Sequence, residues 1–198
     1  GLEINFSCGS RVDTIDRDLM KALLEHGCTA LYFGVESASQ DTLNRIGKRI
    51  TVEQAVRVFQ WAHELKANAV GSFVIGFPWE TLNDMKDTVK LAVKLDPSYA
   101  QFIIATPYPG TPLYYQAVSE NLIEDWNWEH YTTLRAVMRG YKFTRSQVEK
   151  MLAYAYRAFY LRLGFIMREV KEGRLSTIIT AIKNTLVPWF VERLLRRD

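Results

Sequence analysis

The sequence predicts an α/β fold: the C-terminal half of a partial TIM-type (β/α) barrel with parallel strands, followed by an all-helical tail. Two observations support this prediction. Over residues 1–120, short apolar segments alternate with amphipathic helical segments in the order β-α-β-α-β-α-β-α. Such alternation favours a parallel sheet whose strands are joined by right-handed helical crossovers. After residue 120 the strand-like segments end, and the remaining patterns are irregular or helical.

Four segments have the composition of strands. Residues 2–7 alternate apolar and polar side chains, residues 28–35 and 69–77 are nearly continuous apolar runs, and residues 99–105 form the fourth segment. A continuous apolar run is typical of a strand that is covered on both faces. Four strands make half of a barrel, so we expect the missing strands in a longer parent chain, N-terminal to this sequence.

Helices are predicted between these strands from their capping residues and apolar stripes. Residues 39–46 form one short helix, and the capping boxes Thr51-x-x-Gln54 and Thr81-x-x-Asp84 open two longer ones. A capping box satisfies the first free backbone N–H groups of a helix, so each box marks a start. A helical segment with apolar residues at 19–24 is predicted after the first strand, and a short helix at about 112–120 is predicted after the fourth.

Residues 121–198 are predicted to form a separate helical extension. The capping box Thr144-x-x-Gln147 opens a long helix that we expect to end at Gly173, and one or two further helices complete the chain. Residues 1–133 carry 11 Lys and Arg against 17 Asp and Glu, whereas the remainder carries 14 against 5. The basic tail is therefore expected to face an anionic partner or the acidic first part of the chain.

Composition is typical of a soluble globular protein, with 48% apolar and 24% charged residues and a net charge of +3. Cys8 and Cys28 are too few for a disulfide framework, and the three histidines fit no zinc-binding spacing. We expect a cytoplasmic protein that binds no nucleic acid. Residues 187–197 form a basic amphipathic segment that can contact a membrane surface or the missing part of the parent protein.

The segments that follow the strands are the candidate ligand sites, because ligands bind at the carboxyl ends of barrel strands. Glu36 and Ser37 follow the second strand and can bond a ligand's hydroxyl or ammonium groups, or can cap the next helix. Gly76 after the third strand gives a ligand room against the backbone, and Pro78 fixes the turn. An ordinary strand–turn–helix junction is the alternative. Lys48 can reach a ligand carboxylate or can be a solvated surface charge.

Three segments together resemble the radical S-adenosylmethionine (radical SAM) superfamily. They are residues 34–48, with Gly-Val-Glu-Ser at their start, residues 73–81, and the proline-rich residues 106–114. Their order and spacing are similar to those of radical SAM barrels. Within the superfamily, the likeness is to proteins with an N-terminal cobalamin-binding domain, including oxygen-independent magnesium-protoporphyrin ester cyclases and cobalamin-dependent methyltransferases.

This resemblance implies a parent enzyme that reductively cleaves S-adenosylmethionine at a 4Fe-4S cluster. The implied product is a 5′-deoxyadenosyl radical that abstracts hydrogen from a small-molecule substrate, and the cofactors carry this chemistry while the protein binds and orients them. The implied outcome is tetrapyrrole ring cyclisation or oxidation, or cobalamin-dependent methylation. Cobalamin is therefore a further cofactor that the parent chain is expected to bind.

By position, the resemblance also implies the residues that contact the cofactor: Glu36, Ser37, Lys48, Ser72, Gly76, Pro78 and Tyr108. Glu36 and Ser37 match groups at the ribose or amino end of the cofactor. Lys48 matches a cation that binds the cofactor's carboxylate. Ser72 stands where some relatives have a carboxylate for the ribose, so we expect a weaker contact there. Trp79 stands where relatives usually have glycine, so the turn can differ.

One departure from the family is decisive for this chain. The family's cluster is held by three cysteines in a C-x-x-x-C-x-x-C motif, and Cys8 and Cys28 cannot replace it. We therefore expect a C-terminal fragment that holds no cluster and is inactive alone. The alternatives are a non-catalytic binding or scaffold protein, and an α/β enzyme that uses Glu36 and Glu80 as acid and base. The open edge of the leading strand favours dimerisation by strand pairing.

Overall fold

The computed structural model describes residues 4–174, 176 and 179. Four parallel strands form one sheet in the order β1-β2-β3-β4. The strands are β1 (Phe6–Ser10), β2 (Cys28–Glu36), β3 (Ala69–Ile75) and β4 (Tyr99–Ile104). The helices between them are α1 (Arg17–Glu25), α2 (Gln40–Arg45), α3 (Val52–Glu64) and α4 (Leu82–Leu95). The predicted parallel α/β fold is confirmed.

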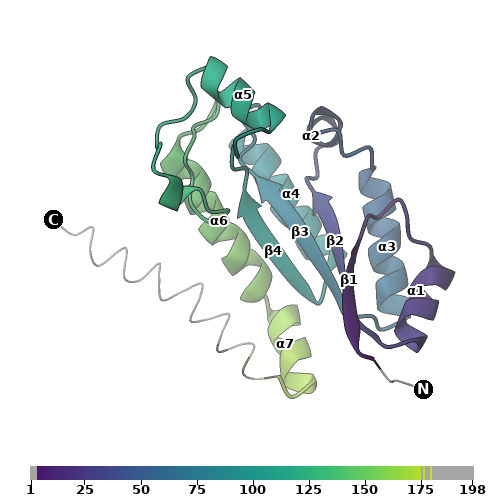
Figure 1. Cartoon of the computed structure of the whole chain (residues 1–198). Coiled ribbons are helices and arrows are strands. Elements are labelled where there is room, and N and C mark those ends of the chain that lie inside the picture. The colour runs from purple at the N-terminus through teal and green to yellow at the C-terminus, as the bar shows by residue number, and fades with distance from the viewer. Residues whose placement is uncertain (1–3, 175, 177–178, 180–198) are drawn as a thin grey trace.

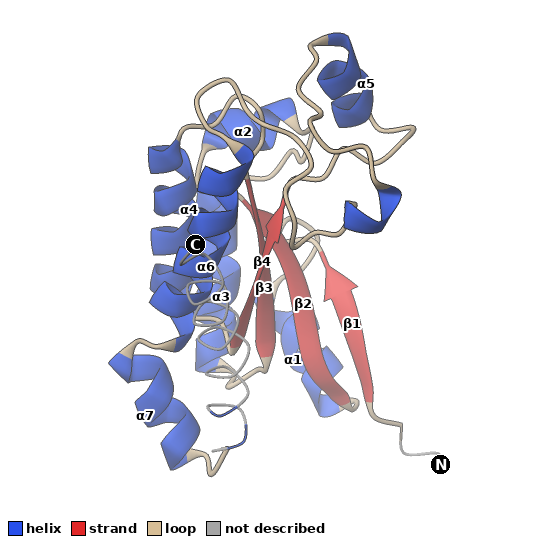
Figure 2. Cartoon of the chain, turned by 90° about the vertical axis from the view of Figure 1, so that its left-hand side faces the viewer, coloured by secondary structure: helices blue, strands red, loops and turns tan. Residues whose placement is uncertain are grey.

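The helices lie on one side of this sheet (Figures 1 and 2). Side chains alternate along each strand, so that Phe33, Phe73 and Phe102 point toward the helices and are at most 1% exposed. Their neighbours Ser72 and Gln101 point to the opposite face. In the described part of the chain, the helices α1 to α4 leave the other face of the sheet uncovered over much of its length (Figure 2).

The remaining elements follow β4. The helix α5 (Pro112–Ser119) and the short 3₁₀ helix η1 (Trp128–His130) lie in the part of the chain beyond the carboxyl end of the sheet (Figure 1). The bridge between Ile123 and Met138 closes this segment. A second small apolar cluster forms beneath α5 and includes Val74, which comes from the open face of β3. The open face is therefore covered near the carboxyl end of the sheet.

The three capping boxes expected from the sequence are all present. In each, the threonine hydroxyl accepts from the backbone N–H of the residue three positions later, and that residue's side chain accepts in return. They open α3, α4 and α6 (Arg145–Tyr160). These starts were predictable because a capping box is a local interaction within four residues.

Two predicted elements differ from the structure. The first strand is Phe6–Ser10, so Ile4 and Asn5 of the predicted residues 2–7 precede it, and residues 2 and 3 lie outside the described residues. The predicted long helix is two helices, α6 and α7 (Leu163–Lys171), because Arg162 has an extended backbone. Its guanidinium donates to the carbonyl of Val93 at 3.0 Å and pairs with Asp96, and this contact ties the break to the end of α4. The apolar pattern continues across the break and conceals it.

Residues from both predicted parts of the chain share one core. Phe143, Val148 and Phe159 belong to the same buried cluster as Ile75 and Phe102 of the sheet. The boundary after residue 120 stays a prediction. The predicted final helices and the basic segment at 187–197 lie outside the described residues. Among the residues that are described, we find no helix with the length and apolar character needed to cross a membrane.

The two edges of the sheet are finished differently. At the outer edge of β4, the backbone N–H of Ala100 donates to the hydroxyl oxygen of Tyr160 at 3.2 Å, and that hydroxyl donates to the carbonyl of Ala100 at 2.8 Å. The hydroxyl of Tyr156 donates to the carbonyl of Phe102 at 3.0 Å. Two side chains of α6 thus take the place of a neighbouring strand. In the described part of the chain, β1 pairs only with β2, and dimerisation through its edge stays a prediction.

Removing the Tyr160 hydroxyl should destabilise the protein. In Tyr160→Phe, the N–H and C=O groups of Ala100 lose their partner in a buried place, which we expect to cost about 1–3 kcal/mol in the free energy of unfolding. Urea denaturation followed by circular dichroism measures the difference. The matched control is Tyr154→Phe on the exposed side of the same helix, for which we expect a change within about 0.5 kcal/mol. Equal unfolding midpoints for both variants would contradict the edge-capping role.

Candidate functional site

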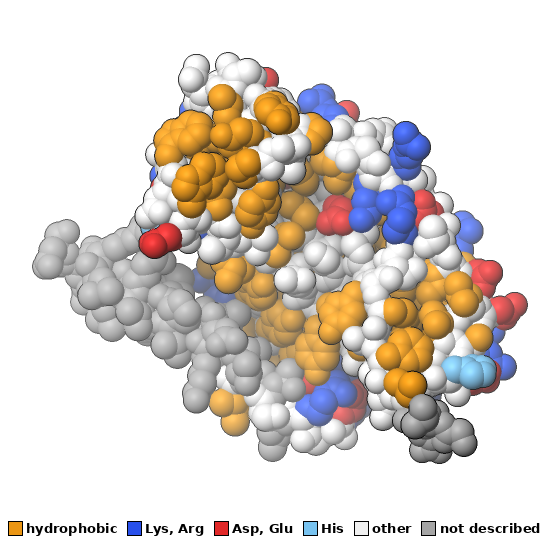
Figure 3. Space-filling model, in the orientation of Figure 1, with side chains coloured by type: hydrophobic (Ala, Val, Ile, Leu, Met, Phe, Trp, Pro, Cys, Tyr) orange, Lys and Arg blue, Asp and Glu red, His pale blue; other side chains and the backbone are white. Residues whose placement is uncertain are grey.

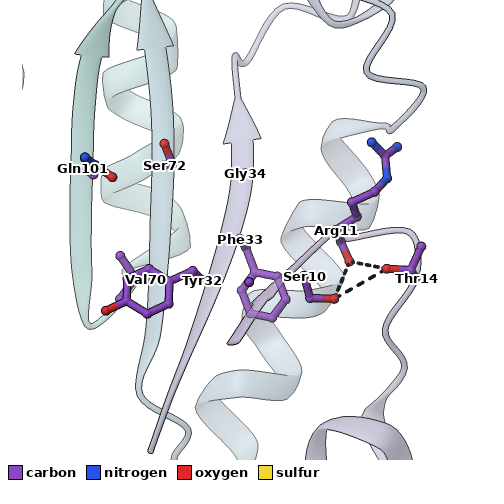
Figure 4. Close-up of a pocket in the computed structure, with 10 residues that line it drawn as sticks. Ser10, Arg11, Thr14, Tyr32, Phe33, Gly34, Val70, Ser72 and Gln101 are labelled. Atoms are coloured by element: carbon purple, nitrogen blue, oxygen red, sulfur yellow. Dashed lines mark hydrogen bonds between the residues drawn. The ribbon is translucent and has the colours of Figure 1, made fainter. Parts of the chain in front are cut away.

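The open face of the sheet contains a hollow of about 550 Å³ (Figure 3). This volume lies within the range of small-molecule and cofactor sites. Its lining comes from all four strands and the segment after β1: Gly9, Ser10, Arg11, Thr14, Tyr32, Phe33, Gly34, Val70, Ser72 and Gln101. Figure 4 shows Ser72 and Gln101 on neighbouring strands, where they are also register partners. Their side chains can both donate and accept hydrogen bonds.

An ion pair lies beside the hollow, above Gly34. The Nζ atom of Lys48 donates to Oε1 of Glu36 at 2.7 Å, and both side chains are about four-fifths buried. A Cβ atom at position 34 would lie 2.7 Å from Lys48 Nζ and still closer to the Glu36 carboxylate. The pair thus fills the space that a side chain at position 34 would enter, and a larger residue there would have to push the ends of these two side chains aside.

The backbone at Glu36 has an unusual conformation. Its φ is +68°, and the N–H of Ser37 donates to the carbonyl of Val35 at 3.0 Å. An N–H bonded two residues back, around a residue with positive φ, is the strained form of the γ-turn. The register between β2 and β3 shifts at the same place, between Gly34 and Glu36. The ion pair is thus presented by a turn and not by a regular strand.

Arg11 brings a second cation to this region. Its guanidinium donates to the carbonyl of Lys48 and pairs with Asp13 at 2.9 Å. This hydrogen bond from Arg11 holds the pKa of the Asp13 carboxyl below its usual range. Because Arg11 follows β1 and Lys48 follows α2, the contact joins two segments that are distant in the sequence.

Glu80 is a buried carboxylate behind the exits of β2 and β3. It is 1% exposed and accepts from the backbone N–H groups of Gly76 at 2.9 Å and Phe77 at 3.1 Å. The hydroxyls of Ser37 and Thr42 donate to its other oxygen at 3.4 and 3.5 Å. Burial raises its pKa to about 7, and the two backbone hydrogen bonds oppose that rise. A carboxylate so enclosed does not act on a ligand in the hollow, so the arrangement does not favour Glu36 and Glu80 as an acid–base pair.

The predicted site residues fall into two groups. Ser72 lines the hollow, and Glu36 and Lys48 form the pair beside it. By contrast, Ser37 is fully buried, and a Cβ at Gly76 would lie 2.6 Å from Val148 of α6. Glycine at position 76 therefore leaves room for α6 and permits a φ of +87°.

The other two predicted residues lie outside the lining of the hollow. Pro78 is buried, and its carbonyl accepts from the N–H of Tyr141 at 2.9 Å. Tyr108 is 42% exposed, and its hydroxyl donates to the carbonyl of Tyr131 at 3.0 Å. Its contact with a cofactor stays a prediction.

Of the residues that line the hollow, the sequence prediction named Ser72, and those it missed include Arg11, Tyr32 and Gln101. Tyr32 and Gln101 are the polar members of otherwise apolar strands, at positions whose side chains alternate with core residues. That alternation was a usable signal. Arg11 directly follows β1 and is therefore a strand-exit residue, like Glu36.

The cysteines do not form part of this site. The thiols of Cys8 and Cys28 lie next to each other, and burial together with this neighbour raises the pKa of Cys8. Within the described residues, no group of three or more Cys, His, Asp or Glu side chains is arranged to bind a metal ion. With two cysteines in the whole sequence, the chain cannot supply the three thiolates of a radical SAM cluster.

Comparison with known proteins gives three informative relatives. Uncharacterized methyltransferase PH0819 of Pyrococcus horikoshii is 44% identical over 94% of this chain and 40% of that protein. Bacteriochlorophyllide d C-8(2)-methyltransferase of Chlorobaculum tepidum is 27% identical over 91% of this chain and 41% of its own length. Anaerobic magnesium-protoporphyrin IX monomethyl ester cyclase of Cereibacter sphaeroides is 24% identical over 81% of this chain and 26% of its own length. The chain thus spans well under half of each relative.

Solved structures share the fold. The archaeal Elp3 of Methanocaldococcus infernus superimposes with a TM-score of 0.58 at 15% identity, covering 77% of this chain and 32% of that one. The radical S-adenosylmethionine methyltransferase TsrM of Kitasatospora setae, with cobalamin and a [4Fe-4S] cluster bound, superimposes with a TM-score of 0.55 at 16% identity. The match covers 77% of this chain and 30% of TsrM. At these identities the likeness concerns the arrangement of the elements.

A parallel sheet with helices on one face and a hollow on the other defines part of a (β/α) barrel of the kind that enzymes use to bind ligands. The family model for the radical SAM superfamily matches residues 1–92. Residues 1–92 therefore match part of a radical SAM domain, and the proteins to which the chain is similar include ones named as methyltransferases and cyclases. The family resemblance seen in the sequence is confirmed.

The pKa of Glu80 predicts that stability falls as the pH rises. Glu80 has its ordinary pKa of 4.5 in the unfolded chain and about 7 in the fold, so the folded state binds more protons between these values. The free energy of unfolding should therefore decrease across that interval by about 3 kcal/mol. In Glu80→Gln, which mimics the protonated carboxyl, this decrease should be absent.

Urea denaturation at several values between about pH 5 and pH 8 measures the effect, taken as the difference between the variant and the unchanged protein. The control is Glu25→Gln, which alters an exposed carboxylate on α1 and should leave the slope unchanged. The assignment is wrong if Glu80→Gln shows the same pH dependence as the unchanged protein.

Proposed function

We propose that this chain is the part of a radical SAM enzyme that binds S-adenosylmethionine in the hollow on the open face of the sheet. The observation that carries the proposal is the buried pair of Glu36 and Lys48 at the edge of that hollow. The family match over residues 1–92 supports it independently. A charged pair held above a glycine, beside polar strand residues, suits a molecule that carries both an amino acid and a ribose.

The residues present fit such a ligand. The ammonium of Lys48 has two donors left after its bond to Glu36, so it can also bind a carboxylate. Glu36 can accept from hydroxyl or ammonium groups of the same molecule. Ser72 and Gln101 offer hydroxyl and amide groups to the ribose from the adjacent strands. The protein's share of the work is to orient this molecule and to exclude water around it.

The residues present do not fit a 4Fe-4S cluster, as the cysteine count shows. In the proposed enzyme, the cluster ligands belong to the part of the protein that this chain, at 26–41% of its relatives' lengths, does not span. We therefore assign this chain no step at the cluster. When bound, the cluster would supply the electron for cleavage of S-adenosylmethionine.

Of the outcomes implied by the family, we propose methyl transfer to a small-molecule substrate ahead of ring cyclisation. The supporting fact is that the relative with 44% identity is called a methyltransferase, whereas the cyclase is 24% identical. Cobalamin is a proposed further cofactor of the full-length protein, since the structurally similar TsrM binds it. The non-catalytic scaffold is the alternative that the next experiment separates.

Replacing the ion pair should weaken cofactor binding in the full-length protein. In Lys48→Met the cofactor's carboxylate loses its cation and Glu36 is left unpaired, so we expect the Kd for S-adenosylmethionine to rise by about tenfold or more. Glu36→Gln should raise it by a smaller factor. Equilibrium dialysis under anaerobic conditions measures the Kd, and formation of 5′-deoxyadenosine after reduction measures cleavage.

The matched control is Lys90→Met, which removes an exposed lysine from α4 that pairs with the neighbouring Asp87. It should leave the Kd and the cleavage unchanged. If the full-length protein with an intact cluster neither binds nor cleaves S-adenosylmethionine, the scaffold alternative is correct and the proposed function is wrong.

A further inference from the structure

The turn at Glu36 has a cost that the rest of the fold must offset. A residue other than glycine with positive φ is strained, and such conformations persist only where their surroundings hold them. Nothing in the side chain of Glu36 relieves this strain, because its carboxylate is bonded to Lys48 and not to its own backbone. The groups that stabilise the positive φ of Glu36 must therefore belong to the residues on either side of it.

Ser37 is the anchored neighbour. Its side chain is fully buried, and its hydroxyl donates to Glu80 at 3.4 Å while lying 3.3 Å from the hydroxyl of Thr88. The same hydroxyl accepts from the N–H of Ser39 at 3.1 Å. The N–H of Ala38 donates to Thr88 at 3.0 Å. The residues after Glu36 are therefore fixed to α4 and to the loop before it.

The turn also explains where the Glu36 carboxylate lies. Along β2 and β3, Gly34 faces Ser72 and Glu36 faces Phe73, so β2 uses two residues where β3 uses one. This compaction brings the carboxylate back over Gly34, where it meets Lys48. In an unbroken strand, residues i and i+2 are about 6.6 Å apart, and the side chain would stand farther along the sheet.

We propose that Ser37 is a positioning residue: through its buried contacts with Glu80 and Thr88 it holds Glu36 in the strained turn and thereby keeps the Glu36 carboxylate over Gly34, at the edge of the hollow. This role differs from the direct cofactor contact expected for Ser37 from the sequence, which its complete burial does not favour. The inference rests on the proposed function for its consequence in cofactor binding, but the holding of the turn stands on the geometry alone.

A double-mutant cycle in the full-length protein tests the inference. Ser37→Ala should raise the Kd for S-adenosylmethionine by about five- to tenfold, because Glu36 is no longer held. In a Glu36→Gln background, the same change should alter the Kd by less than about twofold, since the group that Ser37 positions is already gone. A serine that merely stabilises the fold would have the same effect in both backgrounds.

Ser39→Ala is the matched control. Ser39 caps α2 by accepting from the N–H of Thr42 at 3.2 Å, so this change removes a hydroxyl from the same loop and weakens the fold without releasing Glu36. We expect it to change the Kd by less than about twofold in both backgrounds. A Kd that rises as much in Ser39→Ala as in Ser37→Ala would overturn the positioning role.

Hydrogen exchange of the backbone over residues 34–38 gives a readout that does not involve the cofactor. Ser37→Ala should speed this exchange by about tenfold or more, and Ser39→Ala should not. Unchanged exchange in Ser37→Ala overturns the inference. If exchange is faster in Ser37→Ala but the single variant Glu36→Gln leaves the Kd unaltered, Ser37 holds the turn and Glu36 is not a cofactor contact. A failure of the positioning role can thus be distinguished from a failure of the proposed function.

Discussion

The arrangement at the carboxyl end of the sheet depends on one buried carboxylate. Glu80 accepts hydrogen bonds from the backbone after β3 and from hydroxyls after β2 and on α2, so it joins the start of its own loop to a segment that lies about 40 residues earlier in the chain. Such an ionisable group is costly to bury and is retained where its partners are all in place. Glu80 therefore connects the loops after β2 and β3 on the side of the sheet away from the hollow.

This arrangement separates two kinds of polar residue that look alike in the sequence. Glu36 and Glu80 both follow a buried strand, and Ser37 and Ser72 both stand near a strand exit. In the structure, Glu36 and Ser72 belong to the open face, whereas Ser37 and Glu80 form the internal framework. Ser37 and Glu80 are buried away from solvent. They can contribute to a ligand site only by positioning other residues.

Much of the fold could be predicted from the sequence because its signals are local. The capping boxes at Thr51, Thr81 and Thr144 and the apolar runs of β2 and β3 depend on residues within a few positions of one another. The break at Arg162 could not be predicted, since Arg162 pairs there with Asp96 at the C-cap of α4, 66 positions away. The buried position of Ser37 was likewise not predictable, because its partners Glu80 and Thr88 come from distant parts of the sequence.

The tyrosine hydroxyls bonded to the outer edge of β4 have a consequence for the side from which a barrel can be completed. Tyr156 and Tyr160 are bonded to the outer edge of β4, so no further strand can pair there unless α6 is displaced. Further strands can be added to the described sheet at β1, its other edge (Figure 1). A cylinder completed from one side only retains a lateral seam next to α6. At that seam, within the part of the chain that the structure describes, side chains of α6 and not a further strand are bonded to β4.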